Sequence, residues 1–169
     1  MHQKDALLES WQKEIPITQK VLTAFPENKA DYKPHEKSRS AIELAWIFVI
    51  GQQKTQKLLE GTFSAVPNFP PHPNSWRDLV VAFEAESLLN LDKLKRSSDA
   101  DLEPAIKIVD PYAGKFTWKE VPRSYFLWFL LNDHVHHRGQ LSIYLRLVGG
   151  KVPSIYGPSA DDPWTPPNK

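Results

Sequence analysis

Four stretches of the chain carry apolar residues at intervals of three and four, which is the spacing of one face of an α-helix. They cover, to within a few residues, 5–25, 40–59, 76–95 and 122–148. Pro26, Gly61 and the pair Gly149-Gly150 follow three of these stretches, and such residues commonly end helices. Four long amphipathic segments in one chain predict an all-α fold, namely a four-helix bundle.

Local signals refine the expected ends of these helices. Ser40 begins a capping-box sequence, and either Asn74 or Ser75 is suited to cap the third segment. Pro122 suits the first turn of the fourth helix. Pro16 falls inside the first apolar pattern, so we expect a kink or a restart there.

The helical pattern is interrupted in two places. The connection between the second and third helices contains four prolines within 67–73 and is long enough to favour one crossover between helices. Residues 106–109 and 115–118 are short runs rich in β-branched and aromatic side chains, on either side of a turn sequence at 111–114. They predict a short hairpin between the third and fourth helices.

Length, composition and charge narrow the class of protein. The chain has 169 residues, which predicts a single domain over 1–169, with the proline-rich tail 151–169 packing on the bundle. The net charge of +1 gives no reason to expect a nucleic acid partner. Cysteine is absent, so disulfides and thiolate ligands are excluded. The longest apolar run, 44–51, is too short for a membrane span, and we expect a cytoplasmic protein.

Three of the six histidines fall within four residues, at His134, His136 and His137. On a helix, Asn132 and His136 share one face because they are four residues apart. We predict that this face, which also carries Phe129, Gly139, Ile143 and Leu147, lies toward the bundle interior and that His134 is exposed. His136 is then either a metal ligand or a neutral histidine hydrogen-bonded within the core.

Asp133 and His137 are also four residues apart and can form a carboxylate–imidazole hydrogen bond. Such a pair either orients a ligand or is an ordinary contact on a helix surface. It belongs to a second stripe of the same helix, with Phe126, Leu130, Leu141 and Tyr144. Two largely apolar faces on one helix predict that one packs on its own bundle and the other on a second copy, giving a homodimer.

The run His-His-Arg-Gly-Gln-Leu at 136–141, with 144–146 and 149–161 after it, resembles the DinB-like superfamily of small DNA-damage-inducible helical proteins. Residues 37–41 and 43–46 are similar to its second-helix signature. The resemblance implies an up-down-down-up four-helix bundle, usually dimeric. It also implies a three-histidine site with an open position for zinc, nickel or a similar divalent ion.

Matched residue by residue, the ligand position on the second helix falls on Ile47, and the two on the fourth helix fall on Asn132 and His136. Only His136 matches, so the resemblance predicts a degenerate metal site. His137 is a weaker ligand candidate, because His134 and His137 are three residues apart and share another face.

Two functional hypotheses follow. The first is a dimeric, stress-associated binding protein that takes a small molecule in a pocket lined by Trp46, Ile47, Asn132, His136 and Tyr144. The second is a divalent-metal-dependent enzyme that uses His136, either a transferase acting with a small thiol or a hydrolase. A purely structural dimer module is a third alternative.

Overall fold

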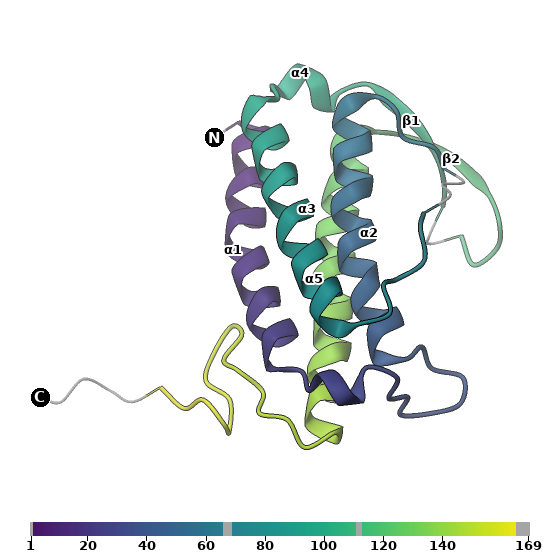
Figure 1. The fold of residues 1–169 in the computed structure, drawn as a ribbon. Coiled ribbons are helices and arrows are strands. Elements are labelled where there is room, and N and C mark those ends of the chain that lie inside the picture. Colours follow the sequence, from purple (N-terminus) through teal and green to yellow (C-terminus); the bar gives the residue numbers. More distant parts are fainter. Residues whose placement is uncertain (1, 66–68, 111–112, 165–169) are drawn as a thin grey trace, which may run out of the picture.

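The computed structural model describes residues 2–65, 69–110 and 113–164, and four long helices dominate it (Figure 1). They are α1 (Gln3–Ala24), α2 (Ala41–Glu60), α3 (Trp76–Arg96) and α5 (Arg123–Leu147). Along the bundle, α1 and α5 run in one direction while α2 and α3 run in the other (Figure 1). This is the predicted up-down-down-up four-helix bundle, with the connection between α2 and α3 as its crossover.

The short elements lie between the long helices. A single 3₁₀ turn, η1 (Glu27–Lys29), precedes α2, and the one-turn helix α4 (Asp99–Leu102) follows α3. An antiparallel pair, β1 (Ala105–Val109) and β2 (Trp118–Pro122), then leads into α5. Over the described residues, no helix combines the length and the hydrophobicity that a membrane span requires.

The predicted hairpin is present, but its second strand is displaced. We expected 115–118, whereas β2 begins at Trp118, and part of the predicted turn, 111–112, lies outside the described residues. The observed register pairs Ile106 with Val121 and Ile108 with Lys119. It lets the buried Val121 join Ile108 in the core, and that burial outweighs the β-propensity of the earlier residues.

Capping interactions fix the starts of α2 and α3 as the sequence indicates. The Ser40 N–H donates to the Glu43 carboxylate (2.6 Å), and the Glu43 N–H donates to the Ser40 hydroxyl oxygen (3.3 Å). Of the two candidates for α3, Ser75 is the cap. The expected restart at Pro16 is wrong, because α1 continues through it. Pro16 is exposed, so water can solvate the carbonyl group that the proline leaves without a donor.

Apolar side chains inside the bundle form two clusters, one toward each end. The first draws on the end of α1, the starts of α2 and α3, and the end of α5, and includes Phe48, Phe83 and Leu141. The second draws on the opposite ends together with the hairpin, and includes Trp11 and Leu131. Both clusters are assembled from all four long helices, so the core runs the length of the bundle.

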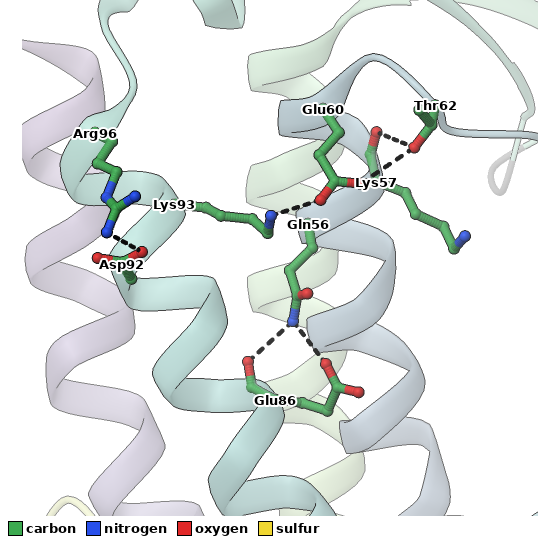
Figure 2. Close-up of polar contacts among 8 residues, drawn as sticks. All are labelled: Gln56, Lys57, Glu60, Thr62, Glu86, Asp92, Lys93 and Arg96. Atoms are coloured by element: carbon green, nitrogen blue, oxygen red, sulfur yellow. Dashed lines mark hydrogen bonds and ion pairs between the residues drawn. The ribbon is translucent and has the colours of Figure 1, made fainter.

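Polar side chains hold the parallel pair α2 and α3 in register (Figure 2). The Gln56 amide donates to the carbonyl oxygen of Glu86 (3.1 Å) and to its carboxylate (2.8 Å). One turn farther along, the Lys93 ammonium pairs with Glu60 at 2.5 Å. In an antiparallel pair, a short loop fixes how two helices lie against each other. The connection between α2 and α3 is long and cannot do so, and these side-chain contacts take that role.

Candidate functional site on helices α2 and α5

The histidine-rich segment lies in the middle of α5, and the orientation we predicted for it is wrong. His134 is buried (3% exposed), whereas Asn132 and His136 are exposed. Residues two apart on an α-helix point in nearly opposite directions, so only one of His134 and His136 can face the core. The predicted interior stripe is the outer face, on which Ile143 and Leu147 are 60% and 55% exposed.

His134 is a core histidine. Its Nε2 lies 2.7 Å from the Thr18 hydroxyl, and its ring packs against those of Trp11, Phe48 and Phe83. Burial, with the nearby Arg138 charge, lowers the pKa of His134 from 6.5 to about 3. The imidazole is therefore neutral at physiological pH. It joins the two apolar clusters, because it contacts Phe48 and Phe83 of the first and Trp11 of the second. The hydrogen-bonded core histidine that we considered for His136 is found at His134.

Arg138 is a charged residue of α5 whose side chain is buried, with 1% of its surface exposed. Its guanidinium pairs with Glu14 of α1 at 2.6 Å and donates to the Tyr156 hydroxyl oxygen at 2.6 Å. The Tyr156 hydroxyl in turn donates to Glu14 at 2.8 Å. A buried guanidinium needs such partners to offset its desolvation. This network joins α5, α1 and the C-terminal segment, so it is structural.

Asp133 and His137 form the carboxylate–imidazole pair that their spacing predicts. His137 Nδ1 lies 3.3 Å from the Asp133 carboxylate and 2.8 Å from the Asp133 carbonyl oxygen. The hydrogen bond to the carboxylate raises the pKa of His137. Burial acts to raise the pKa of Asp133, but the hydrogen bond and the charge of His137 outweigh it, and the pKa is lowered. The charged form of the pair is thus favoured.

A cation from α2 faces this pair. Burial lowers the pKa of Lys54, and the Asp133 charge opposes that shift. The Lys54 ammonium also lies 5.7 Å from the centroid of the Phe69 ring. Arg39, before α2, is close enough for its charge to act against protonation of His137. The surface between α2 and α5 therefore combines one carboxylate, one imidazole and two cations.

The residues present do not fit the metal centre that the resemblance implies. Among the side chains that the structure describes, no three histidine, aspartate or glutamate groups come together to hold an ion. Asp133 and His137 supply two donors, but the positive charge of Lys54 opposes a divalent ion beside them. His136 lies on the outer face, where its Nε2 is 3.0 Å from the Gln140 amide nitrogen. Ile47 is half-buried and offers no donor atom.

A cleft of about 720 Å³ opens where α2 begins and α5 ends. Four other clefts on the described surface measure about 300–380 Å³. The lining residues come from the loop before α2 and from both helices: Pro34, Lys37, Ser38, Arg39, Leu44, Gln140, Ile143 and Tyr144. Of the predicted pocket, only Tyr144 lines this cleft. Trp46 lies apart from its lining and donates its indole N–H to the Pro70 carbonyl oxygen (3.0 Å).

A sequence model of the DinB family matches residues 1–167. The chain belongs to the DinB family. This confirms the resemblance drawn from residues 136–141 and 149–161. The other members to which the chain is similar identify its fold and no activity.

Three relatives illustrate this. The uncharacterized protein YrdA of Bacillus subtilis (strain 168) is 26% identical over 159 residues, covering 94% of this chain and 90% of YrdA. The crystal structure of a DinB-like protein from Bacillus cereus ATCC 10987 superposes with a TM-score of 0.74 at 24% identity, covering 92% of this chain and all of that one. A second DinB-like structure, YjoA from Bacillus subtilis, gives 0.66 at 20% identity, covering 85% and 92% of the two chains.

Sequence reasoning missed Lys54 and Arg39. Lys54 lies seven residues after Ile47, two helical turns along, so helix spacing alone would have placed it on the same face as the expected ligand position. Arg39 and Lys37 stand just before the capping box of α2. Both belong to the segment 37–41 that resembles the family's second-helix signature, but that resemblance does not show that their charges face α5, which only the fold reveals.

Proposed function

We propose that this DinB-family chain is a non-catalytic binding protein that takes a small molecule on its α2–α5 surface and has a degenerate metal site. The observation that carries the proposal is the pairing of Asp133 with His137 beside the Lys54 cation. Two groups that would serve as metal donors satisfy each other, and a positive charge stands near them.

Coordination chemistry supports this assignment. A catalytic divalent ion needs roughly three protein donors and an open position. Binding at Asp133 and His137 would require the imidazole to give up its proton and its hydrogen bond, which lowers metal affinity. The nearby Lys54 ammonium adds electrostatic repulsion, because partial burial weakens its screening by water.

The alternative is a divalent-metal-dependent enzyme, a small-thiol transferase or a hydrolase, that uses His136. Its support is that the exposed His136 ring lies 5.1 Å from the His137 ring, centroid to centroid. Two adjacent imidazoles on an open surface could bind zinc or nickel if His137 turned away from Asp133. Only a measurement on the protein separates the two functions.

Titration calorimetry with zinc and then nickel, at neutral pH, tests the proposal. The wild-type protein is compared with His136→Ala, His137→Ala and, as a matched control, His35→Ala in the loop before α2. We expect no binding tighter than about 100 μM for the wild type, as for isolated surface histidines. Micromolar or tighter binding that both His136→Ala and His137→Ala abolish, while His35→Ala retains it, would favour the metalloenzyme.

We further propose that the protein is a homodimer through the outer face of α5 and neighbouring helices. Leu147, which is not among the residues that line the neighbouring cleft, projects from that face and is 55% exposed. Burying apolar side chains of this size is the main driving force for association.

In light scattering after size-exclusion chromatography at micromolar concentration, we expect a dimer. Leu147→Lys should shift it to monomer, whereas Leu89→Lys, a change of similar exposure on α3, should not. A wild-type monomer contradicts the proposal.

A further inference from the structure

The loop before α2 and the last turns of α5 lie at the same end of the bundle (Figure 1). They supply most of the lining of the cleft at that end. Its volume of about 720 Å³ falls within the usual range of roughly 300–1,000 Å³ for small-molecule sites. Neither the metal hypothesis nor the predicted pocket accounts for it, since it shares only Tyr144 with that pocket.

The charged residues that line the cleft are both positive. Lys37 and Arg39 line it, and none of the other lining residues is acidic. Neither cation forms an ion pair with another residue that the structure describes. The nearby Glu43 carboxylate is already engaged by the Ser40 N–H at 2.6 Å and by Lys33 at 3.8 Å. Two unpaired cations at one cleft leave a positive potential for an anion to neutralise.

The loop that carries these cations is held in place before any ligand arrives. The Tyr144 hydroxyl donates to the Arg39 carbonyl oxygen at 3.3 Å, which ties the loop to α5. The Lys37 N–H donates to His35 Nδ1 (3.1 Å), and the Ala41 N–H donates to the Tyr32 carbonyl oxygen (2.9 Å). A preorganised loop reduces the entropy cost of binding.

The cleft also offers an apolar surface. Ile143 of α5 lines the cleft and is 60% exposed, whereas Leu44 of α2, at 2% exposed, adds little accessible surface. The lining also includes the Ser38 hydroxyl and the Gln140 amide, both able to hydrogen-bond an oxyanion. The site is therefore two-sided, with a cationic part and a hydrocarbon part.

We propose that this cleft binds a small amphipathic organic anion, with its carboxylate or phosphate group on Arg39 and Lys37 and its apolar part against Ile143. The proposal rests on the proposed binding function and names the class of ligand. A guanidinium binds either oxyanion in a bidentate manner. The overall charge of +1, with only two cations at the cleft, argues against a polyanion.

The test is titration calorimetry of the full chain with benzoate, phenyl phosphate and the uncharged analogue benzamide. Arg39→Gln removes one of the two positive charges of the cleft, and Arg77→Gln, at an exposed position on α3, is the matched control. Arg39 is exposed, so neither variant should affect folding, which circular dichroism verifies.

We expect benzoate or phenyl phosphate to bind at least about tenfold more tightly than benzamide, since a charged hydrogen-bonded pair contributes on the order of 1.5–3 kcal/mol. Arg39→Gln should remove most of that preference, and Arg77→Gln should keep it. The anion whose affinity exceeds that of benzamide by the larger factor shows whether the cleft prefers a carboxylate or a phosphate.

Equal binding of all three probes, or anion binding that Arg39→Gln leaves unchanged, overturns the proposed ligand class and site. In the second case the protein still binds small molecules and the proposed function stands. Tight zinc binding at His136 and His137 would overturn the proposed function, while the effect of Arg39→Gln on benzoate would still decide the cleft.

Discussion

His134 and Arg138 illustrate what a single polar residue does inside this bundle. Both are almost fully buried, and each is stabilised by partners from α1, namely Thr18 and Glu14. Sequence spacing located the histidine cluster but could not orient it, because α5 carries large apolar side chains on its outer face as well as toward the core. The partners that make a buried histidine and arginine tolerable come from residues more than a hundred positions away.

The buried state of His134 predicts a pH dependence of stability. Its pKa in the folded protein is about 3, below the ordinary histidine value of 6.5, so the unfolded chain takes up this proton first as the pH falls. The free energy of unfolding should decline as the pH drops from about 6.5. In urea unfolding between pH 7 and pH 5, His134→Gln should weaken that decline. His136→Gln, at an exposed site, should leave it unchanged, and equal slopes in all three proteins would disprove this account of His134.

The surface around His137 predicts a different titration. Its pKa is raised, chiefly by the hydrogen bond to Asp133, and the Arg39 charge acts in the opposite direction. In an NMR titration of the imidazole resonances, Asp133→Asn should lower the pKa of His137, whereas Arg39→Gln should raise it further. A His137 resonance unmoved by Asp133→Asn would mean that the pair does not form in solution. Because the pKa of His137 is higher in the folded protein than in the unfolded chain, protonated His137 stabilises the fold below pH 6.5. That contribution is lost as the pH rises through the pKa of His137 in the folded protein.

At the level of elements, local signals were reliable where they act within one turn. The Ser40 capping box, the Ser75 cap and the glycine after α2 all lie where the sequence places them. The strand β2 was misplaced because its register depends on which side chain reaches the core, and that is decided by α5 and the hairpin together. No restart occurs at Pro16, because the proline is exposed and water can solvate the carbonyl group that it leaves without a donor. A pattern of residue types does not reveal that exposure.

The capping box makes a quantitative prediction for α2. Ser40→Ala removes the acceptor for the Glu43 N–H and should reduce the free energy of unfolding by about 1 kcal/mol. Ser38→Ala, two residues earlier and outside any cap, should change it by less than about 0.5 kcal/mol. Chemical denaturation measures both, and equal losses would show that the cap does not stabilise the helix start.

For the whole molecule, four helices and their order followed from periodicity and from residues 136–141. We also expected the tail 151–169 to pack on the bundle, but the sequence did not indicate which contacts hold it there. Val152 and Ile155 pack against the first apolar cluster, and Asp161 accepts hydrogen bonds from the Val152 N–H and from Arg146. No periodic pattern announces such contacts, because the segment is irregular and proline-rich. The Glu14–Arg138–Tyr156 network is the main polar link between it and the bundle.

That link can be tested at the scale of the molecule. Tyr156→Phe keeps the ring over Arg138 but removes the hydroxyl that donates to Glu14 and accepts from Arg138. We expect a loss of about 1–2 kcal/mol in the free energy of unfolding. Trp164 is equally exposed, at 63%, so Trp164→Phe is the matched control and should have little effect. Equal stability of the two variants would show that the tyrosine hydroxyl is dispensable.

The central claim is that the α2–α5 surface of this DinB-family chain is a binding surface and no metal centre. Its most direct test is the metal content, by mass spectrometry, of untagged protein purified without chelator, before and after incubation with zinc, nickel or manganese. We predict background metal in every sample, with His136→Ala indistinguishable from the wild type. Near-stoichiometric metal that disappears in His136→Ala would contradict the claim and identify a metalloprotein.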